Sequence, residues 1–259
     1  MGNSHIKLSD WFYGVDSGSS IPIPAAIYSY WKLDEVSGDA IDSLGNKNLT
    51  EVGTVSAGLT GIFGNYRYGF APTTYLEGLN TQADTKYLSG GNHTYVIEAF
   101  VQADTVTSRY YQAIYQTTEK AHYLRFDGDI ATNVASAQYV DGTIVSSTAA
   151  DMHSAWHHIM EAKIGQGVAD TNRLYVDGVL VDAAVGNAST VSADGNIHIG
   201  IQKYYGSLRY QAMNLKICDV AWWTDLTLDN VPGTGTLAER IDAIAAQRWN
   251  DGAGQQYTV

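Results

Sequence analysis

Acidic side chains that could act as a catalytic pair occur in two short segments of the sequence. LDEVSGD places Asp34 next to Glu35, and TYVIEAFVQAD contains Glu98. Retaining hydrolysis of a glycosidic bond needs two carboxyl groups about 5 to 5.5 Å apart. On a strand these must occupy alternate positions, because neighbouring residues face opposite sides. Asp34 and Glu35 fail this test, and the residues at alternate positions after Glu98 are Phe100 and Gln102. We therefore expect that this protein is not an enzyme.

The histidines and the cysteine give no stronger sign of catalysis. His157 and His158 are adjacent in AWHHIMEAK, an expected strand, so at most one faces a ligand. No second histidine or cysteine is spaced to share a metal, and we favour one inward, hydrogen-bonded ring and one solvated ring. Cys218 lies in the apolar run LKICDVA and is expected to be a buried, inert thiol. A triad from distant segments stays open, although no nucleophile-elbow motif supports one.

Adjacent aromatic residues are the best indication of a ligand surface. The chain has 18 tyrosines and 6 tryptophans, and in a strand one member of an adjacent pair must leave the core. Exposed rings stack on the C–H faces of sugars, and they are equally typical of subunit contacts, so both interpretations stay open. Arginines beside two pairs could orient either ligand. The candidate ligand residues are Tyr110, Tyr111, Tyr204, Tyr205, Trp222, Trp223, Arg109 and Arg209.

Composition limits the possible partners. The 259 residues carry a formal net charge of -12, which argues against nucleic acid because a phosphate-binding surface must supply lysine and arginine. No apolar run is long enough to span a bilayer, so no membrane insertion is expected. The first residues, MGNSHIKLSD, lack the basic and apolar regions of a secretory signal.

The order of patterns along the chain predicts a β-sandwich. Residues 1–26 end in a Gly/Ser segment with two prolines, which is typical of an extended arm or linker. Short β patterns then recur, and Asp141-Gly142 and Asp177-Gly178 each separate two β-branched runs, as type I′ hairpin turns do. Many short strands, two hairpins and one terminal helix together favour an all-β sandwich.

A single helix is expected near the C-terminus, at about residues 237–250. Thr236 and Glu239 have the spacing of a capping box. An apolar stripe at a four-residue step should dock the helix on a sheet, and Gly252 can adopt the left-handed conformation that ends it. The stripe consists of Leu237, Ile241, Ala245 and Trp249.

With these elements placed, residues 27–259 resemble the laminin G-like or concanavalin A-like lectin/glucanase domains. YWKLDEVSGDAIDSLGNKNLT resembles the opening strand and acidic loop, and YLEGLN and TYVIEAFVQ resemble the paired strands that follow. AWHHIM, RLYVDGVLV, IHIG and NLKICDVA then come in the family's order, before the tail RWNDGAG. The resemblance implies a two-sheet antiparallel jelly roll with a C-terminal helix, preceded by the arm of residues 1–26. Trp31 and Leu33 should face its core.

The same resemblance implies a structural calcium site near the acidic loop. It places Asp42 as a carboxylate ligand, with backbone carbonyls near Gly45 and Asn46, and Asn214 where relatives supply a second acid. Asn214 is neutral, which weakens a site for a cation that prefers six to eight oxygens. A formed site and an absent one both stay open. The alternative for Asp42 is a turn residue whose carboxylate accepts backbone amides.

Domains of this kind mostly bind carbohydrate or protein, and a minority are glycoside hydrolases or lyases. They also occur as decoration and adhesion modules of bacteriophages. Since secretory and disulfide signals are absent, our leading interpretation is a non-catalytic capsid, decoration or tail subunit on a virion surface. Its arm would contact other subunits in a homo-oligomer, and its jelly roll would face outward toward host glycans. The alternative is a free extracellular lectin, calcium-assisted or not, and a hydrolase or lyase ranks third.

Overall fold

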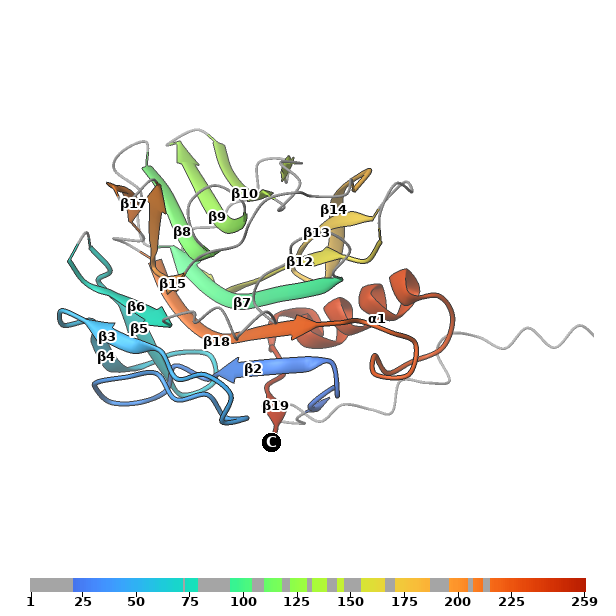
Figure 1. The fold of residues 1–259 in the computed structure, drawn as a ribbon, viewed down its shortest axis with the longest axis horizontal. Helices are drawn as coiled ribbons and strands as arrows, with labels where there is room; N and C mark the ends of the chain where they lie inside the picture. The colour runs from blue at the N-terminus through green and yellow to red at the C-terminus, as the bar shows by residue number, and fades with distance from the viewer. Residues whose placement is uncertain are drawn as a thin grey trace, which may run out of the picture.

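The computed structural model describes most of the chain from Ile21 to the C-terminus. The described residues are 21–71, 73–78, 94–103, 110–117, 122–129, 132–138, 144–146, 155–165, 171–186, 196–204, 207–211 and 215–259. Within this part of the chain the structure consists mainly of two large β-sheets and one α-helix (Figure 1). The predicted all-β sandwich with a C-terminal helix is confirmed.

One layer is a seven-stranded antiparallel sheet. It is built mainly from the middle of the chain, and an early pair of strands closes one edge. In spatial order its strands are β11 (Ile144–Ser146), β10 (Thr132–Gln138), β9 (His122–Asp129), β8 (Tyr110–Thr117), β15 (Ile197–Ile199), β6 (Tyr75–Gly78) and β3 (Thr50–Val52).

The other layer is an eight-stranded antiparallel sheet. Its centre is formed by two long strands, β7 and β18, that are far apart in the sequence. In spatial order its strands are β14 (Val179–Ala184), β13 (Asn172–Val176), β12 (His157–Lys163), β7 (Tyr95–Ala103), β18 (Leu215–Thr224), β5 (Asn65–Tyr68) and β4 (Ser56–Thr60), with β2 (Ile27–Trp31) also paired to β18.

Two small strand pairs complete the described structure. β16 (Ile201–Tyr204) pairs with β17 (Ser207–Gln211), and β1 (Ile21–Pro22) pairs in parallel with β19 (Tyr257–Thr258). Ile21 and Ala26 are buried in the same cluster as Tyr257. The predicted arm therefore ends too late, since residues 21–26 are packed into the domain.

The hairpin between β13 and β14 follows the predicted turn chemistry. Asp177 and Gly178 have φ values of 52° and 75°, as a type I′ turn requires. A Cβ on Gly178 would lie 2.8 Å from the Cα of Ala246, so glycine also allows the turn to approach the helix. The second predicted hairpin, at Asp141-Gly142, lies outside the described residues.

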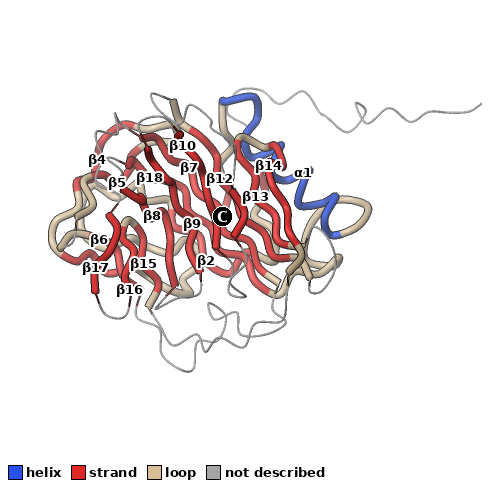
Figure 2. Tube along the Cα trace, turned by 90° about the horizontal axis from the view of Figure 1, so that it is seen from above, coloured by secondary structure: helices blue, strands red, loops and turns tan. Residues whose placement is uncertain are grey.

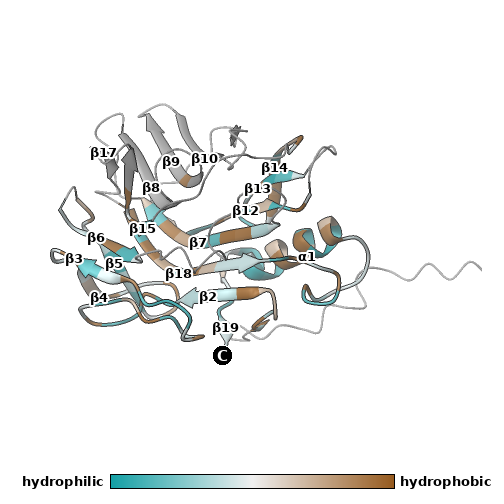
Figure 3. Ribbon diagram, in the orientation of Figure 1, coloured by the Kyte–Doolittle hydropathy of each residue, from teal (hydrophilic) through white to brown (hydrophobic). Residues whose placement is uncertain are grey.

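The main core lies between the two sheets. Trp31 and Leu33 are fully buried there, as predicted, with apolar residues from both layers. Along β7, Ile97, Ala99 and Val101 face this core. Figure 3 shows β7 as a mostly apolar strand with a few polar residues. Because successive strand residues face opposite sides, Val96, Glu98 and Phe100 lie on the outer face of the eight-stranded sheet.

A second apolar cluster covers that outer face and includes the helix. α1 (Leu237–Trp249) begins at the predicted capping box, in which the Glu239 amide donates to Thr236 Oγ1 and the Thr236 amide donates to Glu239 Oε2. Its buried residues are Ile241, Ile244, Ala245 and Arg248. The predicted stripe is thus partly wrong, because Arg248 takes a buried position and Trp249 stays half-exposed. α1 lies beside β12 and β14 (Figure 2).

The last residue of α1 is Trp249, and the next residue, Asn250, caps the helix. Asn250 adopts the left-handed conformation with φ 47° and its amide donates to the carbonyl of Ala246. The residue that ends the helix is therefore Asn250 and not Gly252, which lies in the short η3 segment (Asn250–Gly252). In the part of the chain that the structure describes, no helix has the length and apolar character needed to cross a membrane.

Candidate functional site

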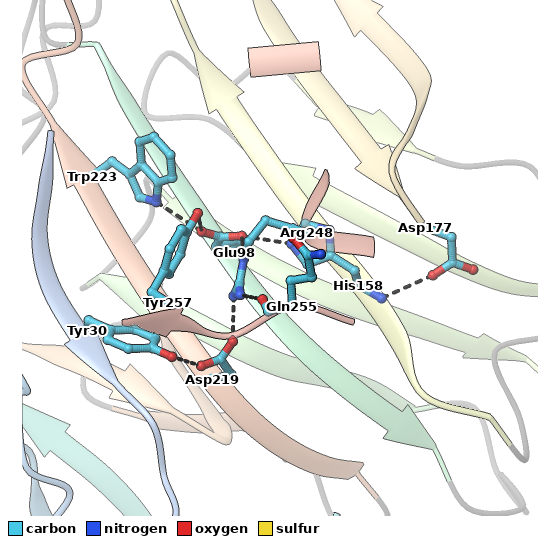
Figure 4. Close-up of polar contacts among 9 residues, drawn as sticks. All are labelled: Tyr30, Glu98, His158, Asp177, Asp219, Trp223, Arg248, Gln255 and Tyr257. Atoms are coloured by element: carbon cyan, nitrogen blue, oxygen red, sulfur yellow. Dashed lines mark hydrogen bonds and ion pairs between the residues drawn. The ribbon is translucent and has the colours of Figure 1, made fainter. Parts of the chain in front are cut away.

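A buried group of polar side chains lies on the outer face of the eight-stranded sheet, where Arg248 of α1 reaches it (Figure 4). Its centre is the guanidinium of Arg248, which connects two carboxylates. Arg248 Nε donates to Glu98 Oε2 at 2.9 Å, and Nη2 donates to Asp219 Oδ2 at 2.5 Å. A third donor, Nη1, reaches the backbone carbonyl of Gln255. The arginine therefore ties the helix, both central strands and the C-terminal segment together.

Glu98 accepts four hydrogen bonds, which fill both carboxylate oxygens. In addition to Arg248, its partners come from a neighbouring strand, the central strand and the last strand. They are His158 Nε2 at 2.8 Å, Trp223 Nε1 at 3.1 Å and the Tyr257 hydroxyl at 2.8 Å. A carboxylate has about four lone-pair positions. Glu98 consequently has no oxygen left for a substrate or metal.

A β-bulge directs Asp219 into this group. The register of β18 against β7 shifts between Cys218 and Ala221, and Asp219 has φ 58°. Strict alternation from Ile217 would point Asp219 into the core between the sheets. The extra residue restores the core side for Val220 and frees Asp219 to meet Arg248 and the Tyr30 hydroxyl.

The two carboxylates differ in their electrostatics. Burial raises the pKa of Glu98, but Arg248 and His158 more than offset burial and hold this pKa at about 2. Burial also raises the pKa of Asp219, and here the lowering by Arg248 only partly compensates. Burial likewise raises the pKa of the Tyr257 hydroxyl. Glu98 is thus the ionised partner that fixes the arginine.

This group is enclosed and has no open side for a ligand. Glu98, Asp219 and Arg248 are all 0% exposed, and α1 covers them. The carboxylates face a shared guanidinium instead of a hollow, so they are not placed to attack a bond or protonate a leaving group. Sequence reasoning noted Glu98 as an isolated charge but missed Arg248. The available signal was the position of Arg248, one heptad after Ile241 on the buried helix face.

The adjacent histidines are both largely buried, contrary to the expectation that one is solvated. His157 lies against Asp177, with Nδ1 and Oδ2 2.7 Å apart, and stacks on Trp249 with 6.3 Å between ring centroids. His158 contacts Glu98. α1 and the turn at Asp177 cover the face of β12 that the sequence left open to solvent.

The acidic loop after β2 is organised around buried positive charge and backbone amides. Arg67, fully buried on β5, contacts Glu51 at 3.1 Å and Glu35 at 3.2 Å. Glu35 therefore serves as a counterion. Asp34 does not form a carboxylate pair with Glu35. The backbone carbonyl of Asp34 accepts a hydrogen bond from the side chain of Asn65.

The carboxylate of Asp42 is filled by hydrogen-bond donors. It accepts from Ser29 Oγ at 2.6 Å and from the backbone amides of Tyr30, Leu44, Asn46 and Lys47 at 2.8 to 3.1 Å. Donor hydrogens occupy the positions that a cation would need, so this side chain does not fit a calcium ligand. Asp42 is the turn residue of the alternative interpretation.

The other predicted calcium ligands, the backbone carbonyls near Gly45 and Asn46 and the side chain of Asn214, stay predictions. The Gly45 amide donates to the Asp42 carbonyl, and the Asn46 side chain donates to the Tyr28 carbonyl. Asn214 lies outside the described residues. Within the described ranges, no group of three histidine, cysteine, aspartate or glutamate residues could hold a metal ion. Calcium binding elsewhere stays a prediction.

Trp222 and Trp223 face opposite sides of β18, as expected, but neither is exposed as a ligand contact would require. Trp222 is 1% exposed in the core between the sheets, and Trp223 is 0% exposed in the cluster beneath α1. Both faces of β18 are covered here because the helix and the terminal strands form a further layer. Burial of Cys218, on the same strand, is confirmed.

The side chains of the remaining candidate ligand residues are not among those that the structure describes. Tyr110 and Tyr111 lie in β8, Tyr204 in β16 and Arg209 in β17, but the structure describes only their backbone. Arg109 and Tyr205 lie outside the described residues. Their roles stay predictions.

A partly exposed aromatic corner lies further along the outer face, beyond the enclosed group. The rings of Tyr66 on β5 and Trp156, just before β12, meet edge-on with centroids 5.6 Å apart at 68°. Lys216 Nζ lies 5.7 Å from the Tyr66 ring centroid and donates to Gln102 Oε1 at 3.1 Å. All four side chains are partly exposed. We call Tyr66, Trp156, Lys216 and Gln102 the aromatic corner.

Successive side chains on a strand point to opposite faces of the sheet, which explains why the side chains of the aromatic corner share one face. Val101 and Ile217 point into the core between the sheets, so the neighbouring Gln102 and Lys216 point outward. Gly61 packs closely behind the rings, since a Cβ there would lie 3.0 Å from Tyr66 and 3.1 Å from Trp156. Sequence reasoning missed this corner because Tyr66 and Trp156 are 90 positions apart and neither belongs to an adjacent aromatic pair.

Comparison with solved structures places the fold. No protein-family model matches the chain, and no curated protein matches its sequence. Domain 4 of AbnA, a GH43 extracellular arabinanase from Geobacillus stearothermophilus solved in complex with arabinotriose, aligns with a TM-score of 0.54 at 13% identity. The alignment covers 86% of this chain and all of that domain. The chain therefore has the fold of an all-β jelly-roll sandwich with one C-terminal helix.

Two further structures match with the same fold over parts of longer chains. The binding domain of botulinum neurotoxin DC, in complex with rat synaptotagmin II, has a TM-score of 0.58 at 10% identity and covers 87% of this chain and 51% of its own. A Trypanosoma rangeli sialidase has a TM-score of 0.53 at 10% identity, covering 90% of this chain and 34% of its own. This chain thus spans about half of the toxin domain and a third of the sialidase.

Proposed function

We propose that this protein is a non-catalytic carbohydrate-binding protein and that the aromatic corner contacts the sugar. The observation that carries the proposal is the pair Tyr66 and Trp156, two partly exposed rings 5.6 Å apart on the outer face of the eight-stranded sheet. Sugar C–H faces pack on aromatic rings, while hydroxyl groups need nearby donors and acceptors. Lys216 and Gln102 provide such groups beside the rings.

The arrangement of acids supports binding without catalysis. Glu98 and Asp219 share one guanidinium in an enclosed group, and Glu35 and Glu51 are counterions of Arg67. These carboxylates contribute to stability and are not presented to a ligand at the corner. The arabinotriose complex of AbnA domain 4 is consistent with a sugar-binding role for this fold, although the likeness is one of fold alone.

A glycan array tests this proposal. We expect the full chain to bind a subset of immobilised glycans and Trp156→Ala to lose that binding while keeping the wild-type circular dichroism spectrum. Val36→Ala is a matched control, because Val36 is 75% exposed and lies in the acidic loop. Binding that survives both Trp156→Ala and Tyr66→Ala would place the sugar elsewhere, and absence of binding to every glycan would contradict the proposal.

We further propose that the protein works as a structural or adhesion subunit on a bacteriophage virion, with a free extracellular lectin as the alternative. The supporting observation is that Ile21 pairs with Tyr257, so the described domain holds the segment that directly follows residues 1–20. We assign residues 1–20 as the arm that contacts other subunits. Sedimentation of the full chain and of a chain lacking residues 1–20 tests this. Equal masses at all concentrations would count against arm-mediated assembly.

A further inference from the structure

The aromatic corner belongs to a longer line of side chains on the outer face of the eight-stranded sheet. The strands β12, β7, β18 and β5 are neighbours in this order. Gln102 on β7 pairs directly with Lys216 on β18. The register of β12 against β7 puts Trp156 beside Gln102. In the same way, the register of β5 against β18 puts Tyr68 beside Lys216. We call Trp156, Gln102, Lys216 and Tyr68 the outer row.

Tyr68 points to the same side of the sheet as the aromatic corner. Its neighbour Arg67 is fully buried and contacts Glu51 on β3, a strand of the opposite sheet, at 3.1 Å. Since successive strand residues face opposite sides, Tyr66 and Tyr68 both lie on the outer face. Both tyrosines are partly exposed. The Tyr68 side chain therefore lies on the surface that carries the aromatic corner.

The aromatic corner by itself offers one sugar ring a single stacking contact. The rings of Tyr66 and Trp156 are inclined by 68°, so one flat sugar ring cannot lie on both. The Lys216 ammonium, 5.7 Å from the Tyr66 ring centroid, occupies one side of that ring. A second stacking contact therefore needs another aromatic ring, and beside Trp156 the outer row contains Tyr68.

The outer row has the composition of a surface for a short sugar chain. The aromatic rings at its two ends suit the C–H faces of sugars, and the amide and ammonium groups between them suit hydroxyl groups. None of its four side chains is acidic. The ends of the row are three strand spacings apart, about 14 Å, which is longer than one sugar ring and fits a short oligosaccharide.

We propose that the outer row binds a linear oligosaccharide laid across β12, β7, β18 and β5, with Trp156 and Tyr68 contacting sugars at opposite ends. This inference rests on the proposed function of the aromatic corner and adds Tyr68 as a ligand residue. A single sugar then contacts the corner only. Each sugar added toward Tyr68 strengthens binding until the row is filled.

NMR titrations of the full chain with synthetic fragments of one to four sugars test this inference. The fragments are those of the glycan with the strongest Trp156-dependent signal on the array. In wild type we expect the affinity to rise with fragment length and then level off. Tyr68→Ala should lower the affinity for the three-sugar fragment about tenfold, the contribution of one aromatic contact, and leave that for the single sugar unchanged. Tyr68→Phe is the matched control, because it keeps the ring, and it should behave like wild type.

The outcomes separate this inference from the proposed function. Equal affinities for all fragment lengths, or a Tyr68→Ala variant with the wild-type dependence on length, would overturn the outer row and leave the corner as a sugar site. A Tyr68→Ala variant that weakens all fragments equally would also overturn it, since that pattern indicates a structural role for Tyr68. Failure of every glycan and fragment to bind would overturn the proposed function as well.

Discussion

Arg248 and Glu98 are in contact although they are separated by 150 positions in the sequence. The guanidinium Nε and the carboxylate Oε2 are 2.9 Å apart, and neither side chain is exposed. This pair places α1 on the outer face of the eight-stranded sheet and connects it to β19 through Tyr257. The helix and the C-terminal segment are consequently part of the domain core.

Replacement of Arg248 by methionine should strongly destabilise the protein. Glu98 and Asp219 would remain buried without their cation, and breaking a buried ion pair from one side costs about 3–5 kcal/mol. Urea unfolding measures the loss in the free energy of unfolding. Arg240→Met is the control, because Arg240 is partly exposed and donates to backbone carbonyl groups, and it should cost about 1 kcal/mol. Equal losses for the two variants would contradict the role of Arg248.

The low pKa of Glu98 predicts a loss of stability in acid. Its folded pKa of about 2 lies below the ordinary value of 4.5, so its contribution is present above pH 4.5 and disappears as the pH falls toward 2. This lowering of the Glu98 pKa corresponds to about 3 kcal/mol in the free energy of unfolding. Asp219 has a raised pKa and opposes this slope. Unfolding free energies from pH 6 to pH 2.5 should therefore fall less steeply in Glu98→Gln, and identical slopes would contradict the assignment.

Gly178→Ala should destabilise the hairpin at the helix contact. The residue has φ 75°, and the new Cβ would lie 2.8 Å from the Cα of Ala246. Gly38→Ala separates the two effects, since Gly38 has φ 79° and no atom within 4 Å of its Cβ position. Strain at positive φ alone costs about 1 kcal/mol. Thermal unfolding should show a clearly larger loss for Gly178→Ala.

Asp42 should act through hydrogen bonds to the backbone and not through a cation. Asp42→Ala would leave four buried or partly buried amides without their acceptor. We expect a loss of several kcal/mol in unfolding free energy, with about 1–3 kcal/mol per unsatisfied group as an upper guide. Calcium or a chelator should leave the midpoint of wild-type thermal unfolding unchanged. A rise in the midpoint with calcium that Asp42→Ala abolishes would restore the metal interpretation.

Local signals in the sequence predicted local structure well. The Asp177-Gly178 turn and the capping box at Thr236 depend on a few neighbouring residues, and both form as expected. Neighbouring residues alone could not predict that Trp223 is buried, because the layer that covers it comes from α1 and from the terminal strands β1 and β19. Strand alternation gives the two faces of β18 but not what covers them.

The candidate site was harder to predict than the fold. Tyr66 and Trp156 come from distant segments, and the pairing of β5 with β18 and of β12 with β7 brings them onto one face. The adjacent aromatic pairs drew attention because they are conspicuous in sequence. For Glu98, the isolated charge in an apolar strand was a correct sign of a buried partner, and Arg248 is that partner.

The central claim is that sugar contacts the aromatic corner, and NMR of the tryptophan indoles tests it most directly. In a titration of the full chain with a glycan that it binds, the indole Nε1–H signal of Trp156, assigned by its loss in Trp156→Phe, should shift in proportion to occupancy. The signals of the buried Trp31, Trp222 and Trp223 should stay in place. Binding that leaves the Trp156 signal unmoved would contradict the claim.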